Sequence, residues 1–131
     1  IFMGEKDFQQ LYLVKKRLEK KYKTKIISCK TIRDNNNVAL SSRNFLLNKN
    51  ELITAGKIAK KLISFKKKGS GKHDLKKTLN IQKNIFNRYH NIRIEYLELR
   101  NKNNLKITNK IRNAKIFIAY YINNVRLIDN F

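Results

Sequence analysis

Cysteine, proline and long apolar runs are scarce or missing in this sequence of 131 residues. The single Cys29 cannot form an internal disulfide, and it is consistent with a reducing compartment. No apolar run approaches the ~20 residues needed to cross a bilayer. The charged residues 5–7 interrupt the apolar start, so we expect no signal peptide in this sequence. We therefore expect a cytoplasmic protein with no membrane partner.

Acidic residues are also few, with 9 Asp and Glu against 31 Lys and Arg, so the formal net charge is +22. Such a charge is typical of nucleic-acid-binding proteins. Proline is absent, however, while lysine, asparagine and isoleucine are abundant, which is the composition that an AT-rich genome produces at tolerant surface positions. We expect non-specific attraction of polyanions and no specific nucleic-acid partner. A small basic nucleic-acid-binding module is the alternative interpretation.

Apolar periodicity in the first third of the chain predicts a strand, a helix and a second strand. Residues 1–3 are typical of the carboxyl end of a buried strand. Leu11, Val14 and Leu18 then form the apolar stripe of a helix. The short apolar run at residues 25–29 follows as a parallel strand.

The remainder of the chain predicts two helices and then a sheet. Asn48 and Glu51 have the spacing of a capping box and open the first of these helices. A linker-like stretch covers residues 66–72, and a further helix spans about 74–89. Alternation with a period of two predicts three antiparallel strands, at residues 92–99, 115–122 and 125–128. An Asn-Asn hairpin turn joins the last two.

Together these elements predict an α/β chain in two parts. Residues 1–33 form the C-terminal end of a Rossmann-type nucleotide-binding domain with a parallel sheet. Residues 34–131 form a small α+β lid domain with an antiparallel sheet. Open α/β sheets bind ligands at the carboxyl ends of their strands, so the residues that follow the first two strands are candidates for a binding site.

Two short polar clusters stand at these strand ends, at residues 4–7 and 40–44. Lys6 in the first is a compact point charge and Arg43 in the second is a planar fork, and both suit phosphate oxygens. The serines beside Arg43 add hydroxyls that donate to the same oxygens. The structural alternatives are a strand–turn–helix junction with acidic residues at the positive helix end, and a simple helix cap.

The order of these clusters resembles the pantothenate synthetase family. The first cluster resembles the segment that the family carries at the end of a Rossmann strand, and the second resembles its signature loop. Two further runs match the family's C-terminal sheet. The matching segments, which span nearly all of the chain in the family's order, are residues 3–11, 31–34, 38–44, 96–100 and 126–130.

The resemblance implies an ATP-dependent ligase that works in two steps. ATP and pantoate first give pantoyl adenylate and pyrophosphate, and the amine of β-alanine then displaces AMP to give pantothenate. The enzyme's task is positioning and charge neutralisation at the α-phosphate. The resemblance also implies Mg²⁺ carried by the ATP phosphates, and a homodimer in the intact enzyme.

The resemblance assigns roles to the first cluster. Lys6 is then a phosphate ligand with a catalytic role, and Gly4 lets the backbone approach the nucleotide closely. Asp7 accepts hydrogen bonds from the ribose hydroxyls, and Glu5 belongs to the same ATP-binding segment. Gln10, one helical turn after Lys6, binds pantoate through its amide.

The second cluster then corresponds to a loop that closes over the triphosphate and supplies charge as pyrophosphate departs. Arg43 is its central residue, and Ser41 and Ser42 share its catalytic role. Leu40 lies in the same ATP-binding loop, and the backbone of Ile32 matches the position that meets adenine.

The match to the family is incomplete. A full-length member is about twice as long, and its first half carries a HIGH-type motif whose histidines stabilise the reacting phosphate. The two histidines here, His73 and His90, stand in no such motif and are expected at the surface. We therefore expect a C-terminal fragment or one piece of a split enzyme, with a separate N-terminal half as partner and little ligase activity alone. An inactive gene remnant is the further alternative.

Overall fold

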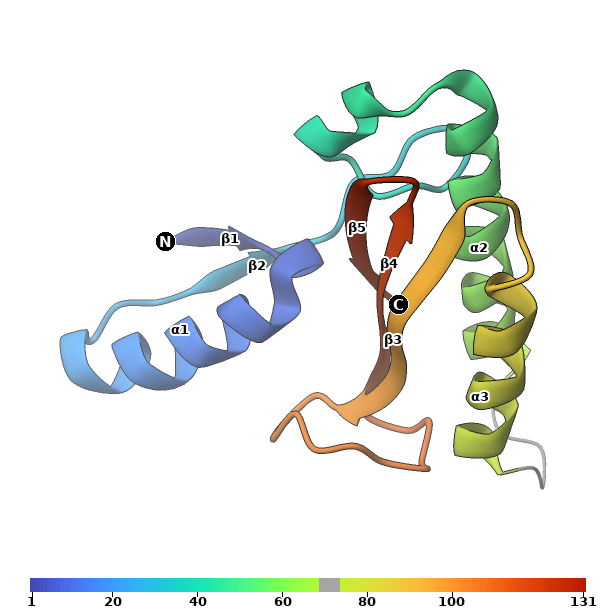
Figure 1. The fold of residues 1–131 in the computed structure, drawn as a ribbon. Coiled ribbons are helices and arrows are strands. Elements are labelled where there is room, and N and C mark those ends of the chain that lie inside the picture. The colour runs from blue at the N-terminus through green and yellow to red at the C-terminus, as the bar shows by residue number, and fades with distance from the viewer. Residues whose placement is uncertain (69–73) are drawn as a thin grey trace.

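The computed structural model describes residues 1–68 and 74–131 and has an α/β architecture with two separate sheets (Figure 1). Helices α2 and α3 lie against the three-stranded sheet, while β1, β2 and α1 project away from it. The elements, with 3-10 turns marked η, are β1 (Phe2–Gly4), η1 (Glu5–Asp7), α1 (Phe8–Tyr22), β2 (Ile27–Cys29), η2 (Ser42–Leu46), α2 (Lys49–Lys68), α3 (Leu75–Phe86), β3 (Ile92–Asn101), β4 (Ala114–Ile122) and β5 (Val125–Asn130).

The N-terminal unit is the predicted strand–helix–strand. Strands β1 and β2 pair in parallel, with Phe2 opposite Ile27 and Gly4 opposite Cys29, and α1 forms the crossover between them. Lys23 takes a left-handed conformation directly after α1 and ends the helix. The two strands bury little of their surface, since Phe2 is 73% exposed. The predicted order of strand, helix and parallel strand is confirmed, but the first strand, expected to be buried, is largely exposed.

The C-terminal sheet has the strand order β3-β4-β5, and both pairs are antiparallel. Ile122 pairs with Val125, so residues 123 and 124 form the predicted hairpin turn, with Asn123 at φ 50°. A register shift between Ile94 and Tyr96 bends β3. All three predicted strands are present, and β5 continues to Asn130, two residues further than expected.

The core forms where α2 and α3 cover this sheet. Its most deeply buried side chains include Ile58 and Leu62 of α2, Phe86 of α3 and Ile116 of β4, and burying each contributes about 1.5–3 kcal/mol. Gly56 is needed because a Cβ there would lie 2.7 Å from the Asn36 carbonyl oxygen. The connection between the two sheets therefore passes closely over α2.

The helix boundaries partly differ from expectation. The capping box is confirmed, since Glu51 accepts from the Asn48 amide at 2.7 Å and Asn48 accepts from the Glu51 amide at 2.9 Å. Helix α2 continues through Lys68, so the first part of the expected linker is helical; the rest of that linker, and His73, lie outside the described residues. Helix α3 ends at Phe86 rather than near residue 89, and His90 is exposed as expected.

No helix in the described part of the chain is long and apolar enough to span a bilayer. The boundary expected between residues 33 and 34 falls in the connection from β2 to η2 and stays a prediction.

Candidate functional site

The two polar clusters meet at strand β5, since both η1 and η2 contact this strand. Lys6 from η1 and Arg43 from η2 line one small cavity together with Ser41. The cavity is also lined by three residues of β5, Leu127, Ile128 and Asp129, and by Val38, Ala39, Asn44 and Tyr120. The structure therefore brings together the two cations that the sequence proposed as phosphate ligands.

This cavity measures about 20 Å³, which is room for about one water molecule. Asn44 adds a buried Oδ1 with no hydrogen-bond partner, and burial raises the pKa of the Tyr120 hydroxyl above its usual value. Arg43 is exposed and Lys6 is half-buried. The site is thus a polar notch beside the exposed Arg43 and is too small to enclose a nucleotide.

The main chain of Lys6 is held by Asn130 at the end of β5. The Asn130 Nδ2 donates to the carbonyl oxygens of Glu5 at 2.8 Å and Lys6 at 2.7 Å. Asn130 is only 3% exposed, and its Oδ1 accepts from the Lys115 amine at 2.8 Å. The two Nδ2 hydrogens of Asn130 thus bind the main chain of η1, and its Oδ1 binds Lys115 of β4.

Arg43 is held by the other end of β5, where its guanidinium donates to the Arg126 carbonyl oxygen at 3.2 Å. Ser41 caps the η2 turn by accepting from the Arg43 amide at 3.2 Å. Asn44 fixes the loop through its Nδ2, which donates to the Ala39 carbonyl at 3.1 Å. The cap alternative considered for this cluster is therefore present, and the same residues also line the cavity.

An ion pair that the sequence did not reveal connects the segment before η2 to β5. Arg33 donates to the two carboxylate oxygens of Asp129 at 2.6 and 3.0 Å, and also to the carbonyl oxygens of Asn37 and Asn130. Burial raises the pKa of Asp129, and the Arg33 guanidinium opposes this rise. Asp129 therefore pairs with a residue of the connection between β2 and η2 rather than with a charge on a neighbouring strand.

Glu5 points away from the cavity that Lys6 and Arg43 share. Its carboxylate lies 3.6 Å from the Lys115 amine, on the side facing the C-terminal end of α2. Burial and the neighbouring charges of Lys115 and Lys102 lower the pKa of Lys66 to about 8, against the opposing charge of Glu5. Glu5 therefore belongs to a lysine cluster on β4 and α2.

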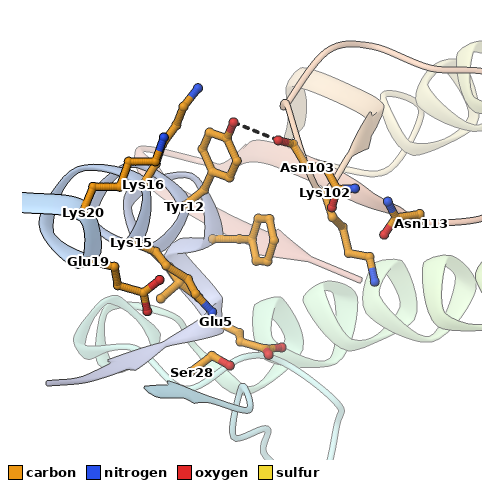
Figure 2. Close-up of a pocket in the computed structure, with 12 residues that line it drawn as sticks. Glu5, Tyr12, Lys15, Lys16, Glu19, Lys20, Ser28, Lys102, Asn103 and Asn113 are labelled. Atoms are coloured by element: carbon orange, nitrogen blue, oxygen red, sulfur yellow. Dashed lines mark hydrogen bonds between the residues drawn. The ribbon is translucent and has the colours of Figure 1, made fainter. Parts of the chain in front are cut away.

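A larger cavity, of about 510 Å³, lies between α1 and the segment that joins β3 to β4 (Figure 2). Tyr12 closes one side by donating to the Asn103 carbonyl oxygen at 2.8 Å. Its rim carries four lysines, Lys15, Lys16, Lys20 and Lys102. Glu5 is the one described residue predicted to bind ATP that lines this larger cavity. The cavity is therefore separate from the notch at Lys6.

The remaining predicted residues lie on the open surface. Gly4, Asp7 and Gln10 are exposed and line none of these cavities. Asp7 stands at the start of α1 and makes no side-chain cap hydrogen bond. The order β1–η1–α1, with Glu5 and Asp7 in the first turn, also matches the structural alternative given for this cluster, a strand–turn–helix junction with acidic residues at the helix start. Ile32 is 71% exposed and accepts through its carbonyl oxygen from the Leu40 amide at 3.0 Å, which places the two next to each other.

No group of three or more metal-binding side chains occurs within residues 1–68 and 74–131. The one carboxylate in the notch, Asp129, is already bound by Arg33. These residues do not form a direct Mg²⁺ site.

The fold is that of an α/β chain with a polar notch beside β5, and comparison with known proteins assigns its family. The sequence profile of the pantoate–β-alanine ligase family matches residues 1–131, so the chain belongs to this family. The pantothenate synthetases of Flavobacterium psychrophilum and Clostridium botulinum are each 38% identical over 133 aligned residues. These alignments cover 98% and 99% of the chain and 47% of each relative.

Solved structures of pantothenate synthetases also superpose on this chain. The pantothenate synthetase of Thermus thermophilus superposes with a TM-score of 0.86 at 23% identity, over 99% of this chain and 48% of that one, which supports the fold. The pantoate–β-alanine ligase of Francisella tularensis, whose structure is a complex with β,γ-ATP and β-alanine, gives a TM-score of 0.69 at 33% identity. That alignment covers 99% of this chain and 42% of the other. The chain thus spans about half the length of the relatives it matches.

Proposed function

We propose that this chain forms one part of an ATP-dependent pantoate–β-alanine ligase, which condenses pantoate with β-alanine through a pantoyl adenylate and releases AMP and pyrophosphate. The observation that carries the proposal is that Lys6 and Arg43, from the two family-like clusters, line one notch in a chain that belongs to this family throughout. The proposed pathway role is pantothenate biosynthesis.

In the proposed site, Lys6 and Arg43 bind the phosphate chain of ATP from its two sides. Ser41 and Ser42 donate hydroxyl hydrogen bonds to the same oxygens. Charge that develops as pyrophosphate leaves is stabilised by cations already fixed in place, which is the largest contribution expected for such chemistry. Because the notch holds only about 20 Å³, we propose that phosphate binds at its mouth or that the η2 segment moves outward on binding.

The rest of ATP is proposed to lie along the exposed residues beside the notch. The main chain at Ile32, with Leu40 next to it, meets adenine, and Asp7 accepts from the ribose hydroxyls. Gly4 allows close approach of the main chain. Gln10, in the exposed first turn of α1, contacts pantoate.

The proposal also includes the metal ion, the partner chains and the location of the complete enzyme. Mg²⁺ arrives on the ATP phosphates, since the described residues offer no carboxylate set for it. A separate N-terminal half supplies the remainder of the site, and the complete enzyme is a homodimer. A cytoplasmic location stays a prediction from the sequence.

The test is ATP–pyrophosphate exchange in the presence of pantoate, measured with the chain alone and with the added N-terminal half of the Flavobacterium psychrophilum relative. We expect little exchange alone and clear exchange with the added half. Arg43→Ala should lower this exchange about 100-fold or more, since a lost donor to transition-state charge costs about 2.7–4 kcal/mol.

Arg112→Ala is the matched control, because Arg112 is exposed and donates no side-chain hydrogen bond within the described residues. Strong exchange by the chain alone would refute the need for a second half. Absence of exchange in both arms would favour the inactive gene remnant.

A further inference from the structure

We propose that Asn130 is a positioning residue which, with the rest of β5, fixes the spacing between the two phosphate-binding cations. The inference rests on the proposed function, because it concerns the same Lys6 and Arg43. It adds a residue that the sequence interpretation treated only as part of a structural motif.

The first support is how the main chain of η1 is held, beside the contact of its Glu5 side chain with Lys115 at 3.6 Å. This turn has three residues, and no side chain caps either it or the start of α1. Its carbonyl oxygens at Glu5 and Lys6 accept from the Asn130 amide at 2.8 and 2.7 Å. Because Nδ2 carries two hydrogens, one for each carbonyl, both donors of Asn130 are committed to η1.

The second support is that Arg43 depends on the same strand. Its guanidinium donates to the Arg126 carbonyl oxygen at 3.2 Å. Arg126 is itself held by Glu95, with contacts of 2.8 and 2.9 Å. The two anchors, Arg126 and Asn130, are four residues apart, which corresponds to about 13 Å along a strand.

The third support is the place of the notch between these anchors. The β5 residues that line it are Leu127, Ile128 and Asp129, which are the residues between Arg126 and Asn130. Strand β5 pairs with β4 over its whole length, and Arg33 holds Asp129. A paired strand resists stretching, so β5 sets the distance at which Lys6 and Arg43 face the notch.

The test uses the complete chain and two variants. Asn130→Ala removes both donors and the acceptor, whereas Asn130→Asp keeps an acceptor for Lys115 and removes the donors. Asn124→Ala and Asn124→Asp are the matched controls, since Asn124 is exposed in the hairpin turn of the same sheet. The measurements are backbone amide order parameters by NMR relaxation and ATP affinity by titration.

We expect both Asn130 variants to lower the order parameters of η1 from about 0.85 toward 0.6 while β3 and β4 keep theirs. ATP affinity should fall about tenfold, and the Asn124 variants should change neither quantity. In a Lys6→Ala background, and likewise in an Arg43→Ala background, Asn130→Ala should cost little further ATP affinity, because its effect depends on the spacing between the two cations.

Unchanged order parameters in η1 would overturn the inference, and so would a loss in the Lys6→Ala background equal to that in the unmodified chain. Retention of wild-type behaviour by Asn130→Asp would also overturn it, because the donors would then be dispensable. Failure of the unmodified chain to bind ATP counts against the proposed function, and the relaxation measurement still decides whether Asn130 holds η1.

Discussion

Gly4 ends β1 with an ordinary extended backbone, at φ −71° and ψ 136°, so its place does not need the positive φ that glycine permits. A Cβ added there would meet no heavy atom within 4 Å. Nothing in the described chain therefore requires glycine at this position. Its proposed role, close approach of the main chain to ATP, depends on a molecule outside the chain.

Gly4→Ala should therefore separate folding from binding. We expect the free energy of unfolding to change by less than about 1 kcal/mol, because alanine adopts this backbone without strain. ATP affinity should fall, since the methyl group occupies the approach. Urea denaturation and ATP titration measure the two effects. Gly56→Ala is the contrasting control and should destabilise by about 1–3 kcal/mol through its contact with Asn36. An unaltered ATP affinity in Gly4→Ala would remove Gly4 from the site.

Asp129 and Arg33 form the buried ion pair that joins the connection to β5. Asp129→Asn keeps the shape of the side chain and leaves the guanidinium without its charge partner, so we expect a loss of about 3 kcal/mol in unfolding free energy. Glu98→Gln is the matched control, since the Glu98–Arg100 pair is more exposed and should cost less than about 1 kcal/mol. Equal losses in the two variants, measured by urea denaturation, would contradict the structural role assigned to Arg33.

Lys66 gives a pH dependence of known sign. Burial, followed by the charges of Lys115 and Lys102, lowers its pKa from 10.5 to about 8 in the folded chain. Between these two values the unfolded chain binds more protons than the folded one, so this group makes stability rise with pH from about 8 to 10.5. Below about pH 8 the Lys66 amine is charged in the folded chain, so the full cost of burying this charge lowers the free energy of unfolding.

Lys66→Met should therefore stabilise the chain at pH 7 and flatten the rise between pH 8 and 10.5. Lys66 is partly exposed, so solvent screening reduces the gain to on the order of 1 kcal/mol. Thermal unfolding across this pH range measures it. Lys67→Met, at the exposed neighbouring position, should leave the slope unchanged. A slope that persists in Lys66→Met would assign the dependence to another group.

At the scale of elements, the sequence pattern correctly predicted the features that depend on residues close together in the chain. The apolar stripe of α1, the capping box of α2 and the Asn-Asn turn between β4 and β5 each depend on residues within a few positions of one another. Boundaries were less accurate where no such signal exists. Lysines suit both a linker and a helix end, and α2 therefore continues to Lys68 where a linker was expected.

The candidate site was predictable in its residues and unpredictable in its support. Lys6 and Arg43 stand in recognisable clusters, and the structure brings them to one notch. Their anchors are far away in sequence, since Asn130 reaches Lys6 across 124 positions. Asp129 similarly reaches Arg33 across 96 positions. A single sequence holds no information that pairs one arginine with one aspartate over such distances, because many equivalent pairs are possible.

At the scale of the whole molecule, much of the exposed apolar surface lies on the N-terminal unit and on η2. Ile1, Phe2 and Ile27 of the β1–β2 sheet are exposed, and Phe45 and Leu46 follow Arg43 on η2. A two-stranded parallel sheet is not stable by itself in water. This surface is what the proposed N-terminal half would cover, and the chain spans about half the length of its relatives.

The net charge of +22 acts on the molecule as a whole and leads to the last prediction. Its lysines are spread over α1, α2, α3 and the segment between β3 and β4 rather than concentrated in one groove. We expect the chain to bind RNA without sequence preference, with log affinity falling linearly against log salt as counterions are released. Fluorescence anisotropy with two RNAs of equal length and different sequence measures both properties, and inorganic polyphosphate, which lacks bases, should compete equally with each. If one RNA binds more than about tenfold tighter at every salt concentration, base contacts supply specificity, and the alternative of a nucleic-acid-binding module would replace the ligase proposal.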